Sequence, residues 1–166
     1  SLDTAQDRTL FFDFMPLEAD AIKGFKTRFL MYTVPGQVMY NTTRRIVLRG
    51  VDGVVFVADS QWGEMEANAE SLKNLEENLR AQGTSLEHVP HVLQFNKRDM
   101  DNIAPEHYME FLLNNGETRR PCFGSVATEG AGVFEALNMV ARLVLHRFVS
   151  GPAGKDAEGQ QLRLVD

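Results

Sequence analysis

Short apolar runs alternate with amphipathic segments along most of this chain, and that order constrains the fold more than any other feature. Val51–Ala58 is rich in β-branched residues and is typical of a fully buried strand. Asn68–Gln82 follows, with Leu72, Leu75 and Leu79 on one stripe, which predicts an amphipathic helix. Strand and helix then alternate again toward the C-terminus. Such an order predicts an α/β domain whose sheet is mainly parallel.

The N-terminal part of the chain predicts a hairpin instead. Leu10–Leu17 is apolar and aromatic, and its strand is expected to end at Pro16. Phe25–Val34 alternates apolar and basic residues, as a half-buried strand does. A turn over Glu18–Gly24 would join the two strands and add one antiparallel edge strand to the sheet. The other expected elements are a weakly marked helix at 38–49, strands at 90–95 and 121–126, and helices at 105–115 and 133–144.

The composition excludes several classes of protein. Hydrophobic residues make up 43% of the 166 residues and charged residues 24%, which fits a single globular domain. No run approaches the ~20 apolar residues of a membrane helix. With 17 Lys and Arg against 23 Asp and Glu, the net charge of −6 argues against a nucleic-acid partner. The single cysteine favours a reducing, cytoplasmic compartment. We expect the domain to span residues 1–149 and a flexible tail to span residues 150–166.

Polar motifs follow the predicted strands where those strands end. Asn96-Lys97-Arg98-Asp99 has an N-K-x-D spacing that suits a guanine. The Asp99 carboxylate can accept hydrogen bonds from the ring N–H and exocyclic amine of guanine, which adenine does not offer in that arrangement. The amide of Asn96 can bind the other edge of the base, and the stem of Lys97 can lie over its face. The position also fits, because ligands of parallel sheets bind beyond the carboxyl ends of the strands.

Three further places fit a phosphate-bearing ligand, although none is decisive alone. The backbone N–H of Ala127 could reach a purine carbonyl oxygen. Gly36 would let backbone approach a terminal phosphate, and Gln37 could orient a water, yet the Pro-Gly pair is also typical of an ordinary turn. The hydroxyl of Thr9 could bind Mg²⁺ and Arg8 could neutralise phosphoryl charge, while both also fit an ordinary surface.

The other reactive side chains form no pattern of their own. The four histidines lack a spacing suited to a metal, and with Cys122 they make no nucleophile set. Cys122 is expected to be a small buried residue. Trp62, which follows a predicted buried strand, is open to two interpretations: an exposed contact residue or a local packing residue.

With these pieces in order, the chain resembles the Ras-like small GTPases, and within them the bacterial gliding-motility branch of MglA-type polarity GTPases. The resemblance runs from about Leu2 to Phe148. It implies a P-loop NTPase fold of the Ras-like kind, a three-layer sandwich around a mainly parallel sheet. The stretches that carry it are Arg8–Phe14, Lys23–Phe29, Tyr32–Gln37, Leu48–Ser60, Asn96–Asp99 and Val126–Glu135.

The resemblance assigns roles on the phosphate side. Thr9 is similar to the switch threonine that senses the γ-phosphate and Mg²⁺, and Arg8 to an arginine that this branch uses as an intrinsic finger. Gly36 is similar to the glycine that binds the γ-phosphate, and Gln37 to the glutamine that positions water. Thr33 stands where most small GTPases carry an Asp, and it could hold Mg²⁺ through a water. This branch resembles the chain in having Thr there.

On the base side, Asn96, Lys97 and Asp99 resemble the motif that selects guanine, with Ala127 as its backbone partner. The implied function is a GTP-binding switch that hydrolyses GTP to GDP and controls cell polarity and gliding motility. The implied partners are a roadblock-fold GTPase-activating homodimer and polarity or motility effectors. The implied location is the cytoplasm, with recruitment to a cell pole.

One expected motif is absent from the printed sequence. No G-x-x-x-x-G-K-[ST] occurs, and Gly24-Phe25-Lys26-Thr27 lacks both the first glycine and the Gly-Lys pair. In the family this loop follows a strand that precedes the first switch. Two explanations stay open. Either residues precede Ser1 in the natural protein, or the chain is a relative without the loop that serves as a protein-interaction module without turnover.

Overall fold

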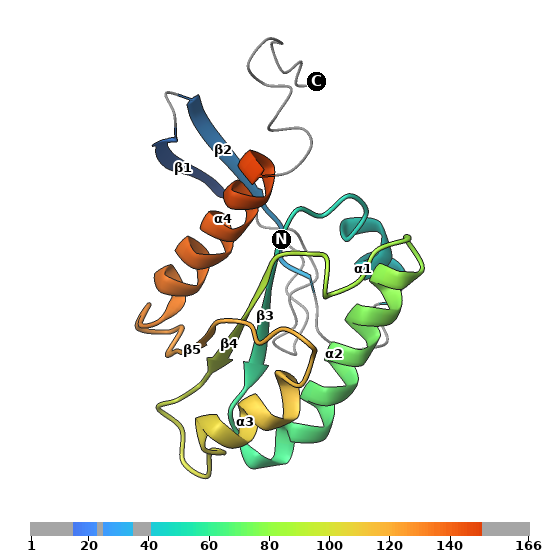
Figure 1. The fold of residues 1–166 in the computed structure, drawn as a ribbon. Helices are drawn as coiled ribbons and strands as arrows, with labels where there is room; N and C mark the ends of the chain where they lie inside the picture. Colours follow the sequence, from blue (N-terminus) through green and yellow to red (C-terminus); the bar gives the residue numbers. More distant parts are fainter. Residues whose placement is uncertain (1–14, 23–24, 35–40, 151–166) are drawn as a thin grey trace, which may run out of the picture.

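The computed structural model describes residues 15–22, 25–34 and 41–150 (Figure 1). Four predicted site residues, Arg8, Thr9, Gly36 and Gln37, lie outside the described residues, as does the expected tail from residue 151 onward. Thr33 and the four base-side residues lie within them. The structure therefore bears on base recognition more than on the chemistry of phosphates.

A three-stranded parallel sheet forms the centre of the molecule. Its strands are β3 (Val54–Asp59), β4 (His91–Asn96) and β5 (Cys122–Gly124), in that spatial order. β3 and β4 pair residue for residue, from Val54 with His91 to Asp59 with Asn96. Because the two strands end level, the polar residues at their carboxyl ends lie side by side. This edge carries the candidate site.

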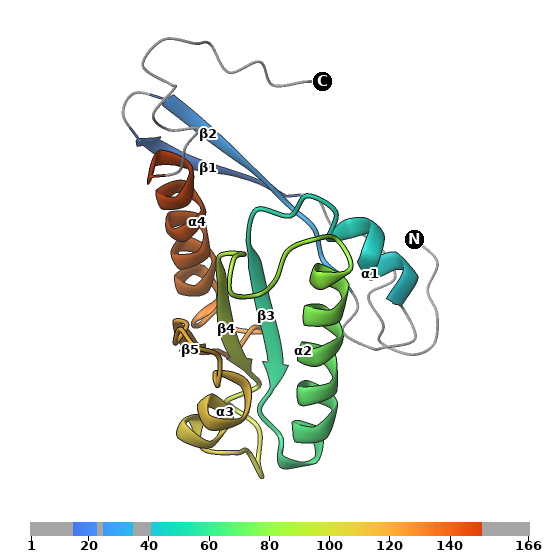
Figure 2. The same ribbon diagram turned by 45° about the vertical axis from the view of Figure 1, so that its right-hand side comes forward.

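Helices cover the sheet on both faces. α1 (Asn41–Val47), α2 (Met65–Arg80) and α3 (Glu106–Leu113) lie on one side, and α4 (Val133–Ser150) lies on the other (Figures 1 and 2). A short 3-10 helix, η2 (Trp62–Glu64), leads from β3 into α2. Among the described residues no helix is long and apolar enough to cross a bilayer.

The main core lies between the sheet and the helices α2 and α3. Phe56 and Ala58 of β3 and Leu93 and Phe95 of β4 point to this side, because alternate residues of a strand share a face. They pack on apolar residues from α2, α3 and the adjoining loops: Leu48, Met65, Leu75, Leu79, Val89, Ala104, Met109 and Leu113.

The prediction of a fully buried strand at Val51–Ala58 is wrong for the face of β3 that points away from α2 and α3. Val57 is 53% exposed, whereas Ala58 beside it is fully buried. α4 is the helix that covers this face, and it contacts β4 more extensively than β3. β4, at the centre, is therefore buried on both faces, while β3 is covered mainly on one.

The hairpin differs from its prediction in two ways. β1 (Met15–Ile22) pairs antiparallel with β2 (Phe25–Met31), so the first strand does not end at Pro16 but includes it and continues to Ile22. A proline is tolerated there because each strand of a two-stranded ribbon has an open edge. Among the described residues β2 is hydrogen-bonded to β1 and not to β3, so the expected antiparallel strand belongs to a second, separate sheet.

Candidate functional site

Asn96, the last residue of β4, joins β4 to the loop that follows β5. Its Oδ1 accepts a hydrogen bond from the Ser125 hydroxyl at 3.1 Å and another from the Ala127 backbone N–H at 3.0 Å. Because both donors converge on the oxygen, the amide nitrogen is left to point elsewhere. The structure thus brings the predicted residues Asn96 and Ala127 into direct contact.

A buried glutamine extends this contact into the sheet. Gln94 donates through Nε2 to the Ser125 hydroxyl oxygen at 3.0 Å, and the same hydroxyl donates onward to Asn96. Gln94 is 4% exposed and Ser125 is 2% exposed. A buried amide is costly unless it is hydrogen-bonded, so this directional chain of donors accounts for a polar residue inside an apolar strand. Sequence reasoning missed Gln94, although its position amid apolar neighbours was a signal.

Lys97 is held by an acidic residue from the neighbouring strand. Its Nζ lies 2.7 Å from Oδ2 of Asp59, the last residue of β3. The hydrogen bond that the Lys97 ammonium donates to the Asp59 carboxylate raises the pKa of Lys97 above its ordinary value. The backbone of Lys97 has a φ of 65°, a left-handed conformation that is rare for a residue other than glycine. Sequence reasoning also missed Asp59, which the level ends of β3 and β4 place here.

Asp59 is itself fixed on several sides. Its Oδ1 accepts the backbone N–H of Gln61 at 3.0 Å. The side chain of Asn68 in α2 bonds to both the N–H and the carbonyl of Asp59, at 3.0 and 2.8 Å. The carboxylate is therefore a rigid anchor for the Lys97 ammonium, and the stem of Lys97 is held at the sheet edge.

The last two residues of the N-K-x-D motif point in different directions. The Arg98 guanidinium donates to the Ala104 carbonyl at 2.7 Å, and its backbone N–H donates to the Ser125 carbonyl at 3.1 Å. Arg98 therefore ties the loop together. Asp99 is exposed, so its carboxylate is open to a ligand.

The loop after β5 requires a glycine at its end. Gly132 has a φ of 74°, and a Cβ there would collide with the backbone of Gly124 in β5. This close approach returns the chain from Ala127 to the start of α4. Ala127 itself is exposed, but its N–H already donates to Asn96. A purine carbonyl oxygen would have to share that N–H or displace Asn96 from it.

The remaining candidates come from other parts of the chain. Thr33 is exposed and lies two residues beyond β2. Within the described ranges, no group of three or more His, Cys, Asp or Glu side chains could hold a metal ion. Burial raises the pKa of the Cys122 thiol to about 11, so it stays protonated and unreactive near neutral pH.

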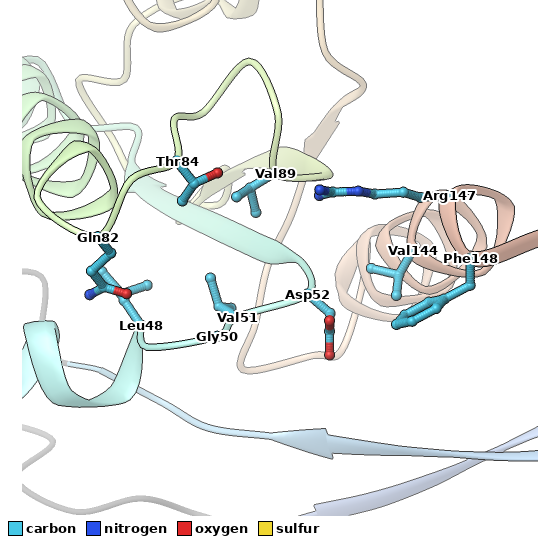
Figure 3. Close-up of a pocket in the computed structure, with 10 residues that line it drawn as sticks. All are labelled: Leu48, Gly50, Val51, Asp52, Gln82, Thr84, Val89, Val144, Arg147 and Phe148. Atoms are coloured by element: carbon cyan, nitrogen blue, oxygen red, sulfur yellow. The ribbon is translucent and has the colours of Figure 1, made fainter. Parts of the chain in front are cut away.

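A cavity of about 430 Å³ lies at the other end of the parallel strands and includes none of the predicted site residues (Figure 3). It is formed by the segments that precede β3 and β4 and by the last turns of α4. Its lining mixes apolar and polar side chains: Leu48, Gly50, Val51, Asp52, Gln82, Thr84, Val89, Val144, Arg147 and Phe148.

Comparison with known proteins identifies the family. No protein-family model matches the chain. The chain is 54% identical over 151 residues to the Mutual gliding-motility protein MglA of Myxococcus xanthus (strain DK1622), which covers 91% of this chain and 76% of that relative. The chain belongs to the MglA-type small GTPases. Membership confirms the predicted Ras-like α/β fold class. It also confirms the resemblance stated from the motifs.

Proposed function

We propose that this MglA-type chain is a guanine-nucleotide switch that acts in gliding motility. The observation that carries the proposal is the arrangement at the carboxyl ends of β4 and β5, where Asn96 is fixed by Ser125 and Ala127. The relative's name, which states gliding motility, supplies the process. The nucleotide and the process are thus supported by different observations.

The base would be read by three side chains. Asp99 would accept two hydrogen bonds from guanine, and adenine lacks that pair of donors. Asn96, whose oxygen is occupied by two donors, would present its amide nitrogen to an acceptor on the other edge of the base. Lys97, anchored by Asp59 at 2.7 Å, would lay its stem on the purine face.

The chemistry at the phosphates would fall to residues assigned by family resemblance. Gln37 would position the attacking water, Arg8 would stabilise charge on the transferred phosphoryl group, and Gly36 would donate its N–H to the γ-phosphate. The hydroxyls of Thr9 and Thr33 are neutral oxygen ligands of the kind that suit Mg²⁺, Thr33 through a water. When bound, Mg²⁺ would neutralise part of the phosphate charge.

The proposed setting follows from the same family. The partners would be a roadblock-fold GTPase-activating homodimer and effectors of polarity or motility. The protein would work in the cytoplasm and be recruited to a cell pole.

The first experiment measures nucleotide on the protein as purified. The sample is denatured, and any released nucleotide is identified by ion-exchange chromatography. A second sample is titrated with GDP and with ADP in the presence of Mg²⁺. We expect GDP or GTP close to one per chain, or GDP bound at least ~100-fold more tightly than ADP.

Two results would contradict the proposal. Equal affinity for GDP and ADP would remove guanine recognition. No guanine nucleotide in the purified sample, and no uptake of added GTP, would favour an interaction module without turnover. A single-turnover measurement of phosphate release from bound GTP separates a hydrolysing switch from a protein that only binds nucleotide.

A further inference from the structure

An exposed aromatic pair lies next to the candidate site and has no part in it. Trp62 of η2 is 42% exposed and Tyr108 of α3 is 37% exposed. Their ring centroids are 4.8 Å apart, with the planes tilted by 55°. The backbone N–H of Trp62 donates to the Asn102 carbonyl at 3.0 Å, which ties η2 to the loop before α3. Trp62 therefore packs locally and is also exposed, and its interpretation as a contact residue stays a prediction.

A third aromatic residue extends the pair outward. Phe111 follows Tyr108 by three residues on α3, so the two side chains are neighbours on the helix surface. Phe111 is 76% exposed, and α3 is anchored on its other side by the buried Met109 and Leu113. We call Trp62, Tyr108 and Phe111 the aromatic patch. Neighbouring exposed aromatic side chains of this kind mark interaction sites, because removing apolar surface from water on binding is favourable.

The rim of the aromatic patch is acidic. The segments 61–66 and 100–112, which carry the patch, contain no Lys or Arg. They contain five carboxylates: Glu64, Glu66, Asp101, Glu106 and Glu110. Arg98 and Arg119 reach two of them from outside these segments, Glu106 at 3.8 Å and Glu110 at 3.9 Å. These are long, partly exposed ion pairs, which neutralise the rim only weakly.

We propose that the aromatic patch is the docking surface for a basic protein segment, one that presents apolar side chains flanked by Lys and Arg. The aromatic rings supply the apolar contact, and the carboxylates supply the complementary charge. The same rim would repel the phosphates of nucleic acid or of anionic lipids. A second copy of this chain is also disfavoured, because a symmetric contact would set one acidic rim against another.

The protein offers an internal reporter for the test. Trp62 is the only tryptophan in the chain, so the emission of the protein reports on this surface. Random 16-residue peptides displayed on phage are selected on the full chain. The enriched sequence, made without Trp or Tyr, is then titrated while Trp62 emission is followed. We expect enriched peptides that combine Lys or Arg with apolar residues, and a saturable change in emission.

Matched variants distinguish binding at the aromatic patch from non-specific hydrophobic binding. Phe111→Ser should weaken binding of the selected peptide at least ~5-fold. Phe134→Ser, at a 62% exposed phenylalanine on α4, should leave binding unchanged. Both side chains are largely exposed, so neither change should unfold the protein.

Four outcomes would overturn the proposal. They are selection of acidic or no peptides, equal binding by wild type and Phe111→Ser, unchanged Trp62 emission on binding, and binding of a lysine-only peptide as tightly as the selected one. Sedimentation that shows a dimer abolished by Phe111→Ser would assign the surface to a second copy instead.

Discussion

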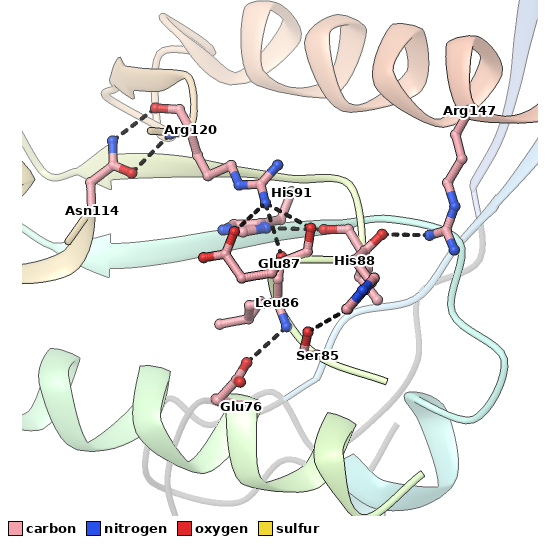
Figure 4. Close-up of polar contacts among 10 residues, drawn as sticks. Glu76, Ser85, Leu86, Glu87, His88, His91, Asn114, Arg120 and Arg147 are labelled. Atoms are coloured by element: carbon pink, nitrogen blue, oxygen red, sulfur yellow. Dashed lines mark hydrogen bonds and ion pairs between the residues drawn. The ribbon is translucent and has the colours of Figure 1, made fainter. Parts of the chain in front are cut away.

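Both ends of the parallel sheet carry polar side chains, but the two ends use them differently. At the amino-terminal end, arginines tie down the loop before β4 (Figure 4). Arg120 donates to the carbonyl of Glu87 at 2.9 Å and lies 3.2 Å from its carboxylate, and Arg147 donates to the carbonyl of His88 at 2.7 Å. Glu76 of α2 accepts the N–H of Leu86 at 2.8 Å. These groups bind one another and hold the fold.

At the carboxyl-terminal end the polar groups are fixed but not used up. Asn96 is oriented by two donors on its oxygen, and Lys97 is anchored by Asp59, yet the side chain of Asp99 stays exposed. A binding site requires polar side chains that are held in place but still have groups free to bind a ligand, because the ligand must find its partners already positioned. The comparison therefore predicts that changes at the first end cost stability, and changes at the second cost ligand.

The largest effect is expected for Asp99→Asn. Replacing a carboxylate by an amide removes one of two charge-assisted acceptors and sets a donor against a donor of guanine, so the affinity for GDP should fall ~100-fold or more. The same amide can donate to the C2 carbonyl of xanthine, so the affinity for xanthosine diphosphate should rise. The measurement is titration with both nucleotides.

The matched control for this change is Asp101→Asn, which alters the charge two residues along the same exposed loop. It should leave GDP affinity within about twofold, since charge alone acts weakly at an exposed position. Unchanged GDP affinity in Asp99→Asn would remove that residue from the site.

At the other end, Arg120→Met should cost ~2 kcal/mol of unfolding free energy, with GDP affinity unaltered. The guanidinium bonds two carbonyls and one carboxylate in the loop before β4. A hydrogen bond to a charged group contributes ~1.5–3 kcal/mol net, and less where the partner is exposed, as Glu87 is here. Urea unfolding followed by Trp62 emission gives the stability. Arg119→Met, at a largely exposed neighbour, should change it little. A loss of GDP affinity in a folded Arg120→Met protein would contradict the division between the two ends.

Much of the fold could be predicted from sequence, because the elements that form it obey local periodicity. α2, β4 and α4 were expected where they lie, since a leucine stripe or an apolar run defines each. Pro16 was interpreted as the end of a strand because local rules do not say which edge a proline faces. Exposure of Val57 depends on how far α4 reaches over β3, which is a tertiary property.

The sequence predicts which residue types form the candidate site, but it does not predict the contacts between them. The N-K-x-D spacing predicts Asn96, Lys97 and Asp99 as base-reading residues, because a motif fixes residue types along the chain, and these roles stay predictions. Asp59 and Gln94 were missed, since their roles depend on pairing between strands and on a neighbour across the sheet. The bond from the Ala127 N–H to Asn96 was not foreseen for the same reason. The roles of Arg8, Thr9, Gly36 and Gln37 stay predictions.

A smaller effect, ~5-fold, is expected on GDP affinity for Gln94→Met. The apolar side chain has similar volume and suits a buried strand, so stability should change by less than ~1 kcal/mol. The Ser125 hydroxyl would lose the donor that directs its own proton to Asn96. The affinity should fall because the Asn96 amide is less well oriented.

A base analogue distinguishes this positioning role from a general disturbance. The nucleotide of 7-deazaguanine lacks the ring acceptor that the Asn96 amide would bind. Wild type and Gln94→Met should therefore bind that analogue equally, although they differ for GDP. An equal loss for both nucleotides would show that Gln94 acts on the fold and not through Asn96.

The smallest effect concerns pH and returns to the amino-terminal end. His91 is 6% exposed, and its Nδ1 lies 3.0 Å from the Val89 carbonyl. Desolvation lowers the pKa of this histidine below its ordinary value, and the charge of Arg120 lowers it further, while Val89, Glu87 and Leu86 oppose the shift. The unfolded chain therefore binds the proton more readily than the native one. Native stability should be full above the ordinary histidine pKa of about 6.5 and decline as the pH falls toward the lowered value.

Urea unfolding of wild type and of His91→Gln at several pH values checks this expectation. The pH values run from about 7.5 to about 5, so that they span the ordinary histidine pKa of about 6.5. Removing the His91 ring should flatten the decline of the unfolding free energy at low pH. His107→Gln, at an exposed position on α3, should leave the pH dependence of the wild type unchanged. GDP affinity should follow neither change, because His91 is the first residue of β4 and lies a whole strand away from Asn96, its last residue. A pH slope that His91→Gln does not alter would place the titrating group elsewhere. A pH-dependent loss of GDP affinity that His91→Gln abolishes would show that the two ends are coupled through β4.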